Sequence, residues 1–319
     1  MPSNRDRYLR FAEEAAGRSP AYVALAEAVA GDQAILSFLG TLPYEKSQPN
    51  LLFGAACYLL GKPADIEQLR GLVGECPSEL AREMVLRRTQ TNEPARCATL
   101  LPALAQLPQP LALIEVGASA GLTLLFDKYS YDYDGQRVTG LDPDAPVLRC
   151  AVTGPVPVPD QVPEIVWRAG LDLDPLDVTN DDDMRWLACM VWPGEGDRLD
   201  RLSAAIATAR RDPPRLHRGD LRTDLPALAA TAPADATVVV FHTAVLNYVP
   251  RPDREQFAKT MAGLRCVWLS NEAPGVTSDI APPARNMHNF LLIRDGSTLI
   301  ASTDSHGVGV QWLAGPRRF

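Results

Sequence analysis

The sequence lacks a basic stripe, a paired-cysteine motif and a long apolar run. Its 319 residues carry 31 basic and 39 acidic side chains, for a formal net charge of −8, and the arginines are scattered. Without clustered positive charge, nucleic acid is disfavoured as a partner. The six cysteines are widely spaced and form no C-x-x-C pair and no cluster with the four histidines. We therefore expect reduced thiols and no metal site.

The apolar runs are short. The longest, residues 51–60, is interrupted by Gly54 and is too short to span a bilayer. Residues 1–17 are polar and lack the apolar core of a signal peptide. We expect a soluble cytoplasmic protein that does not bind a membrane. The chain is long enough for one large domain or two smaller ones, and its hydrophobic fraction of 46% is that of a globular protein.

Residues 1–107 are expected to be helical throughout and to form an N-terminal cap domain without chemistry of its own. Ser19 followed by Pro20 is typical of a helix start, with a capping side chain and a proline at the first helical position. The expected helices cover residues 8–16, 22–30, 51–61, 79–90 and 97–107.

The stretch LALIEVGASAGLTLLFDKYS, residues 111–130, predicts a strand, a glycine-bearing turn and a helix start in direct succession. Residues 111–116 are apolar and indicate a buried parallel strand. Gly117 and Gly121 allow a turn that brings backbone close to a ligand, and the helix start directs free N–H groups towards it. Glu115 is an acid within the strand, so it needs a partner or faces a ligand.

Three interpretations of this motif remain open. As acid-x-Gly-x-Gly-x-Gly, with Ser119 in place of the middle glycine, it resembles the first motif of class I S-adenosylmethionine-dependent methyltransferases. As G-x-S-x-G it forms a nucleophile elbow that exposes Ser119 for acyl chemistry. The third interpretation is an ordinary turn with two glycines. The NAD fingerprint fails, because it requires glycines at Ser119 and Leu122.

The next two strands end in acids. Residues 164–172 predict a second core strand ending in Asp172, where a carboxylate suits the paired hydroxyls of a nucleotide ribose, and Asp174 is the second candidate. Residues 214–221 predict a third strand whose Asp220 takes the position beside the adenine in the methyltransferase pattern. For these acids, helix capping and turn formation are the structural alternatives.

Residues 236–248 supply a fourth strand, in which an apolar run is followed by His242. Ligands bind outside the carboxyl ends of open parallel sheets, so His242 and Tyr248 lie where an acceptor would meet a methyl group. A hydrogen-bonded core histidine is the alternative. A fifth strand, residues 266–270, is followed by Glu272.

The last segment changes to an alternating pattern. Residues 288–294 and 298–302 flank Asp295-Gly296, which is a hairpin signal, and residues 309–313 can extend the returning strand. His306 lies in the loop between them and can turn towards a pocket.

Residues 129–163 are expected to be an insertion. Its alternating tyrosines, Tyr129, Tyr131 and Tyr133, indicate a strand that pairs with residues 147–152 as a hairpin. These tyrosines line a pocket or, as is more common in strands, pack in the core.

The order EVGASAGL, GLDLDP, GDL, VVVFHTAVLNY and WLSNE, followed by a hairpin, resembles a class I methyltransferase core over residues 111–313. The helical N-terminal region with QPNLLF, EVGASAGL, WRAGLDLDPLDV and FHTAVLNYV resembles more closely a family of uncharacterised bacterial proteins, largely actinobacterial, with such a core. The resemblance implies a Rossmann-like α/β domain over residues 108–319, with a mostly parallel sheet and a C-terminal antiparallel hairpin. It also implies S-adenosylmethionine as the cofactor.

The cofactor-binding residues expected from this resemblance are Glu115, Gly117, Ser119, Gly121, Asp172, Asp220 and His242. Two features depart from the family pattern. Ser119 replaces a glycine, and roughly 50 residues separate Gly121 from Asp172, against the ~20 that are usual between such a loop and its ribose acid. An insertion at residues 129–163 explains the second departure.

We therefore expect an enzyme that transfers a methyl group from S-adenosylmethionine to a small-molecule acceptor, mainly by aligning it and excluding water. His242, His306 or Glu272 is the candidate base, with Tyr248 orienting the acceptor. Two other functions remain open: a serine hydrolase that uses Ser119, a later Asp and His306, and a non-catalytic cofactor- or nucleotide-binding protein. A homodimer is an open alternative to a monomer.

Overall fold

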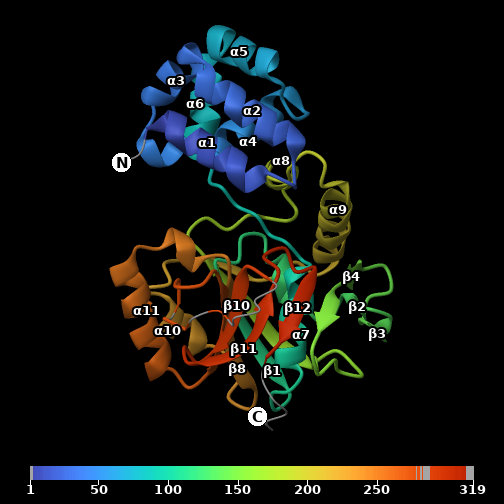
Figure 1. The fold of residues 1–319 in the computed structure, drawn as a ribbon. Helices are drawn as coiled ribbons and strands as arrows, with labels where there is room; N and C mark the ends of the chain where they lie inside the picture. Colours follow the sequence, from blue (N-terminus) through green and yellow to red (C-terminus); the bar gives the residue numbers. More distant parts are fainter. Residues whose placement is uncertain (1–2, 278, 281, 283–287, 314–319) are drawn as a thin grey trace. The chain divides into compact units, whose positions relative to one another are not determined.

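The computed structural model describes residues 3–277, 279, 280, 282 and 288–313. Within these residues the chain has a mixed α/β fold with eleven α-helices and a large, mostly parallel sheet (Figure 1). It divides into two compact units. The helical unit comprises Met1–Thr91 and Asn180–Asp200, and the sheet unit comprises Asn92–Thr179 and Arg201–Phe319.

This division differs from the boundary expected at residue 107. Helix α7 (Arg96–Leu104), expected in the cap domain, belongs to the sheet unit, and α8 (Asp181–Cys189), expected in the α/β domain, belongs to the helical unit. All residues of α7 are buried, so this helix is a core element of the sheet unit. The chain therefore returns once to the helical unit.

The described helices of the helical unit share an apolar core. Its helices are α1 (Asn4–Ala15), α2 (Pro20–Gly31), α3 (Gln33–Gly40), α4 (Pro49–Leu60), α5 (Ile66–Glu75), α6 (Pro77–Leu86) and α8, with a 3-10 turn, η1 (Tyr44–Lys46). Ser19 caps α2 by accepting from the Tyr22 N–H, as its position before Pro20 predicts. A Cβ on Gly54 would lie 1.9 Å from Met190 Cε, so this glycine lets α8 and the turn after it approach α4.

The sheet unit is built on a nine-stranded sheet with the order β5-β12-β11-β10-β9-β8-β1-β6-β7. The strands are β1 (Leu111–Val116), β5 (Ala151–Thr153), β6 (Ile165–Asp172), β7 (Leu216–Arg218), β8 (Thr237–Thr243), β9 (Val267–Glu272), β10 (Phe290–Arg294), β11 (Thr298–Thr303) and β12 (Gly309–Trp312). Strands β7, β6, β1, β8 and β9 run parallel, and β10, β11 and β12 follow as an antiparallel meander. The predicted core strands and the hairpin at Asp295-Gly296 are confirmed.

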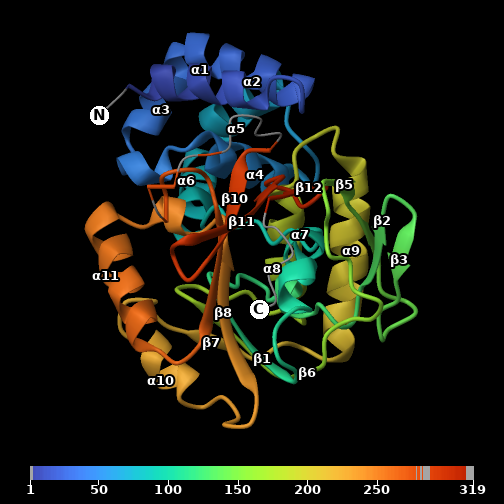
Figure 2. The same ribbon diagram turned by 60° about the horizontal axis from the view of Figure 1, so that its bottom comes forward.

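The other elements of the sheet unit are α9 (Gly196–Arg211), which begins in the helical unit, α10 (Leu225–Ala229), α11 (Arg251–Gly263) and the 3-10 turns η2 (Leu122–Leu124) and η3 (Leu246–Tyr248). Figures 1 and 2 show α10 and α11 together on one side of the large sheet. Ile114, Val240 and Trp268 from the central strands form a core with Phe257 and Met261 of α11. This packing covers the face of the sheet to which even-numbered residues of β1, β8 and β9 point.

The helix predicted to follow Gly121 is absent, and the prediction was wrong. The chain forms only the 3-10 turn η2 there. The Leu122 carbonyl, which a longer helix would use, accepts from the Tyr129 hydroxyl, and the Leu122 N–H, which has no acceptor within a helix at this position, donates to Asn92 Oδ1. The chain then enters β2 (Ser130–Tyr133). The expected helix dipole is therefore not available to a ligand.

The inserted region forms a second, three-stranded sheet with the order β3-β2-β4. Strand β2 pairs antiparallel with β3 (Gln136–Val138) and parallel with β4 (Val147–Arg149). The hairpin expected between β2 and residues 147–152 was wrong, because the Asp134-Gly135 turn returns the chain earlier and β5 joins the large sheet instead. The three tyrosines are fully buried and donate to backbone carbonyls, so they pack in the core.

Candidate functional site

The candidate site lies where the strand order of the large sheet reverses. After β1 the chain continues to β6 and β7 on one side, and after β8 it continues to β9 on the other, although β1 and β8 are neighbours. Ligands of open α/β sheets bind outside the carboxyl ends of such a strand pair. Residues 117–121 follow β1 and are called the β1 loop here. Residues 244–248 follow β8 and are called the β8 loop.

The two loops touch each other. A Cβ on Gly117 would lie 2.5 Å from Val245 Cγ2, and Gly117 has a φ of 72°. Two reasons require a glycine at this position: a residue with a side chain would be strained at this φ, and its Cβ would clash with Val245. The β1 and β8 loops therefore meet at the strand reversal.

Each loop also holds a non-glycine residue at positive φ. Ser119 has a φ of 51° and Ala244 a φ of 59°. Among the described residues the two other such residues, Asp134 and Asp295, precede glycines in hairpin turns, where positive φ is the ordinary geometry. Ala244 has no polar side chain to stabilise the left-handed conformation, so its backbone is strained by roughly 1–2 kcal/mol. Such strain persists where the surrounding contacts fix the loop.

Asp172, at the end of β6, fixes the β1 loop. Its Oδ2 accepts from the Ser119 N–H at 2.8 Å, and its Oδ1 accepts from the Asp174 N–H at 2.8 Å. The Leu176 N–H donates to the Ser119 carbonyl, which joins the segment after β6 to the β1 loop a second time. Each carboxylate oxygen has a further lone pair. Asp172 can therefore accept from a ligand while it holds Ser119.

Glu115 lies on the sheet face that points away from α11. It is 2% exposed, and the Thr123 hydroxyl donates to its Oε1, whereas its Oε2 has no partner among the described residues. Burial raises the pKa of Glu115 to about 8, the Thr123 hydrogen bond opposes this rise, and the negative charge of Asp172 adds to it. Glu115 therefore carries a proton at neutral pH in most molecules.

Glu272, the last residue of β9, fixes the β8 loop from the opposite face of the sheet. Its Oε1 accepts from the Val245 and Leu246 N–H groups at 2.9 and 3.0 Å and lies 2.8 Å from His242 Nδ1. Its Oε2 is buried without a partner among the described residues. His242 and Glu272, both predicted as site residues, are thus brought into direct contact.

The tautomer of His242 follows from its second partner. Trp268 Nε1 lies 3.0 Å from His242 Nε2, and an indole N–H can only donate. His242 Nε2 therefore accepts and Nδ1 carries the proton that it donates to Glu272. Because both ring nitrogens are occupied and the side chain is fully buried, this geometry makes His242 a positioning residue for Glu272.

The remaining predicted residues lie at the same end of the sheet but do not join these contacts. Asp220 accepts from the Arg222 guanidinium, which lowers the pKa of Asp220. Tyr248 is 67% exposed in η3. The His306 N–H donates to Asp304 Oδ1 in the loop between β11 and β12. The described residues contain no group of three or more His, Cys, Asp or Glu that could hold a metal ion.

A buried polar segment that the sequence interpretation missed also belongs to this end of the sheet unit. Asn92 accepts from the Leu122 N–H, as noted above. Glu93 accepts from Arg201 Nε at 2.8 Å, and Arg96 donates to the carbonyls of Thr243 and Ser305. The signal in the sequence was TNEPAR, residues 91–96, where an amide and an acid precede an apolar helix whose first residue is an arginine.

A further polar chain joins the strand ends on the Glu115 face. Asn271 Nδ2 donates to Thr243 Oγ1 at 3.1 Å, and Thr303 Oγ1 donates to Asn271 Oδ1 at 2.6 Å. All three side chains are buried. Together with Arg96, which binds the Thr243 carbonyl, they connect β8, β9, β11 and α7. The end of the sheet is thus polar and rigid on this face.

Sequence comparison places the chain in a family. A family of uncharacterised proteins conserved in bacteria, DUF2332, matches residues 5–312. The chain belongs to the DUF2332 family. This confirms the resemblance to an uncharacterised bacterial family and leaves the methyltransferase-like core of that resemblance a prediction. No curated protein and no solved structure matches the chain. Among the described residues of this DUF2332 protein, no single helix is both long and apolar enough to cross a membrane.

Proposed function

We propose that this DUF2332 protein binds S-adenosylmethionine at the strand reversal between β1 and β8 and transfers its methyl group to a small-molecule acceptor. The observation that carries the proposal is the reversal itself, combined with an acid, Asp172, at the end of the strand next to β1. In doubly wound folds this is the position of the acid that accepts from the ribose hydroxyls of a bound nucleotide.

The polar atoms left without partners support a ligand at this end of the sheet. Glu115 Oε2 and Ser119 Oγ are both buried and have no partner among the described residues. A buried polar atom without a hydrogen bond costs about 1–3 kcal/mol, so a bound ligand that satisfies these atoms gains that energy. These two residues and Asp172 fit a polar, nucleoside-bearing cofactor, and the proposal assigns them to holding it.

The cofactor supplies an electrophilic methyl group, and the protein has to align the acceptor and exclude water. The fixed β1 and β8 loops are suited to alignment, since Asp172 and Glu272 hold them by backbone N–H groups. Glu272 retains a buried oxygen, without a partner among the described residues, that can accept the acceptor's proton. Glu115, which is protonated near neutral pH, can instead donate a hydrogen bond. His242 holds Glu272 and takes no proton itself in this arrangement.

A serine hydrolase is the second candidate, favoured by one observation. Ser119 has the positive φ that a nucleophile elbow requires. Its Oγ, however, has no hydrogen-bonded base among the described residues, and β1 is followed by a 3-10 turn instead of the helix of that fold. We therefore rank methyl transfer first.

The test is calorimetric titration of the purified chain with S-adenosylmethionine and with S-adenosylhomocysteine. We expect micromolar binding that Asp172→Ala abolishes, because the ribose loses its acceptor and Ser119 loses its anchor. The matched control is Asp144→Ala, an exposed aspartate in the loop between β3 and β4. Circular dichroism of each variant separates lost binding from lost fold.

Absence of heat with both ligands, in folded and ligand-free protein, contradicts the proposal. In that case a fluorophosphonate probe decides the second candidate: labelling that disappears in Ser119→Ala establishes a reactive serine. Binding without turnover over a broad acceptor panel supports the non-catalytic alternative.

A further inference from the structure

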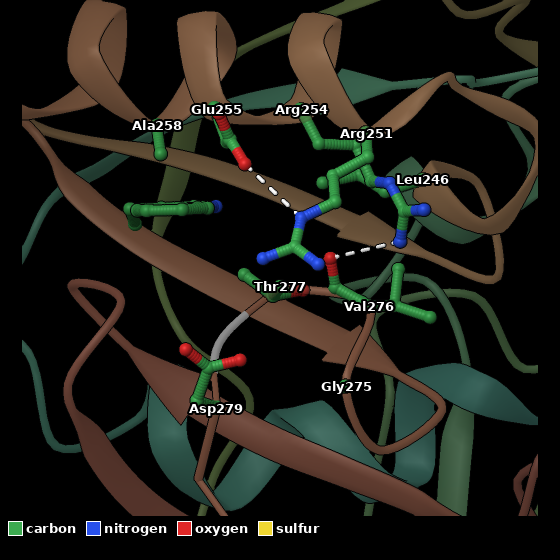
Figure 3. A pocket seen from close by; sticks show the side chains of 10 residues that line it. Leu246, Arg251, Arg254, Glu255, Ala258, Gly275, Val276, Thr277 and Asp279 are labelled. Carbon is green, nitrogen blue, oxygen red and sulfur yellow. Dashed lines mark hydrogen bonds and ion pairs between the residues drawn. The ribbon is translucent and has the colours of Figure 1, made fainter.

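A pocket of about 200 Å³ lies between α11 and the segment that follows β9 (Figure 3). It is separate from Glu115 and the β1 loop, because its walls belong to the α11 side of the sheet. Arg251 and Arg254 line it from the first turn of α11, and Thr277 and Asp279 line it from the opposite segment. Leu246 of the β8 loop also reaches it.

The two arginines have unused donors. Arg254 donates from Nη1 to the Val276 carbonyl at 3.1 Å, while its Nε is buried without a partner among the described residues. Arg251 pairs with Glu255 through Nε alone, at 3.1 Å, and its side chain is 78% exposed. Guanidinium groups suit carboxylates and phosphates because their donors lie in one plane. The α11 wall of the pocket therefore offers donors to an anionic group.

The opposite wall carries a negative charge. Figure 3 shows the Asp279 carboxylate across the pocket from Glu255 and Arg251, and no ion pair joins Asp279 to any described residue. A doubly charged phosphate would be repelled by Asp279 and by Glu255. A ligand with one carboxylate and one ammonium group matches the charges on both walls.

Part of the pocket lining is apolar. Trp268, Ala258 and Leu246 belong to it, and the orientation of Trp268 is fixed because its indole N–H donates to His242 Nε2. A rigid indole beside small aliphatic groups provides contact area for a hydrocarbon side chain. The lining residues thus combine three chemical features in one pocket: a cationic side, an anionic side and apolar side chains.

We propose that this pocket binds a small zwitterion of the α-amino acid class with an apolar side chain. The carboxylate binds the Arg251 guanidinium on the α11 wall, the ammonium binds Asp279, and the side chain lies on Trp268. The proposal does not depend on methyl transfer. Leu246 belongs to the loop that Glu272 holds, so a ligand in the pocket contacts the β8 loop.

The test is a saturation-transfer NMR titration without any cofactor, using four probes: L-phenylalanine, 3-phenylpropionate, phenethylamine and inorganic phosphate. L-Phenylalanine is expected to bind tightest. Arg251→Gln should weaken L-phenylalanine and 3-phenylpropionate about tenfold and leave phenethylamine unchanged, whereas Asp279→Asn should weaken L-phenylalanine and phenethylamine about tenfold and leave 3-phenylpropionate unchanged.

Arg265→Gln is the control, since this exposed arginine follows the far end of α11 and should alter no affinity. Arg251 and Asp279 are both exposed, so their variants are expected to fold. The proposal is overturned if L-phenylalanine shows no saturable binding up to about 10 mM. It is also overturned if phosphate binds more tightly than L-phenylalanine, or if neither variant changes the affinity. A failed titration with S-adenosylmethionine has no bearing on this result.

Discussion

Glu115 and Glu272 are two buried acids at the same end of one sheet, and they are held in opposite ways. Each is 2% exposed and each has one oxygen without a partner among the described residues. They point to opposite faces, because Glu115 pairs in register with Phe241 whereas Glu272 shares the face of His242. Glu272 Oε1 accepts hydrogen bonds from three N–H groups, whereas Glu115 Oε1 accepts one hydrogen bond, from a hydroxyl.

The difference shows that donors, and not burial alone, decide what a buried acid does. The three N–H groups on Glu272 fix its side chain, which thereby holds the β8 loop. The single hydroxyl on Glu115 is too little to offset burial, and its pKa rises to about 8. Glu272 is therefore suited to a structural role in the site, and Glu115 is suited to gaining and losing a proton near neutral pH.

The largest expected effect is the loss of stability in Glu272→Ala. The variant leaves His242 Nδ1 and the Val245 and Leu246 N–H groups unsatisfied, which should lower the free energy of unfolding by about 4 kcal/mol. Glu115→Ala frees only a hydroxyl that can rotate to another acceptor, so at about pH 4, where the natural Glu115 is largely protonated in both the folded and the unfolded chain, it should lower the free energy of unfolding by about 2 kcal/mol. Urea unfolding followed by near-UV circular dichroism measures both. An equal loss in the two variants would remove the distinction between the acids.

The pH dependence of stability should come from Glu115. Its pKa is about 8 in the folded chain and near 4.5 when unfolded, so between these values the folded state holds a proton that the unfolded state has lost. The free energy of unfolding should therefore fall as the pH rises from 4.5 to 8, by up to about 1.4 kcal/mol per pH unit, and level off above that range.

The matched comparison for this slope is Glu115→Gln, which cannot titrate and imitates the protonated acid. The difference in the free energy of unfolding between this variant and the natural chain should grow by about 2–3 kcal/mol from pH 6 to pH 8, in favour of the variant. If both proteins have the same slope, the pKa of Glu115 is not raised, and burial with a single hydroxyl donor does not change the protonation of this acid.

The smallest expected effect is that of Thr123→Val. Removing the hydroxyl takes away the one donor that lowers the pKa of Glu115, so the upper end of the pH window should move to higher pH. Above that window the variant should lose about 1 kcal/mol of stability relative to the natural chain. The control is Thr208→Val, another buried threonine of the sheet unit, whose hydroxyl donates to the Ala204 carbonyl in α9. A shift of the pH window in the control would point to a general effect of removing hydroxyls.

Much of the sheet could be predicted from the sequence, because the signals are local. Apolar runs bounded by glycine, proline and acids located β1, β6 and β8, and Asp-Gly located the hairpin. The helix after Gly121 could not be predicted correctly. The Leu122 carbonyl, which a continuing helix would use, accepts instead from the Tyr129 hydroxyl, and the Leu122 N–H is bound by Asn92, 30 residues earlier in the chain. Local propensity does not include such long-range hydrogen bonds.

The arrangement of the candidate site could be predicted in part for the same reason. The acids Glu115, Asp172 and Glu272 stood out as charged residues at strand ends, and the structure places all three at one end of the sheet. The partner that fixes the tautomer of His242 is Trp268, which lies 26 residues away and is indistinguishable in sequence from a core aromatic. The role of His242 follows from that contact, so it required the structure. Cofactor and acceptor stay predictions.

The return of the chain to the helical unit has a consequence for synthesis. A nascent chain leaves the ribosome with α1 to α6 complete before α8 exists. Trp186 and Met190, which lie against Gly54, belong to the core of those helices. The first unit to emerge is therefore the one that must wait, with its core open on one side, until β1 and β6 have also been made. The helical unit therefore cannot complete its fold before synthesis of the sheet unit has begun, as it would if the domains folded one after the other during synthesis.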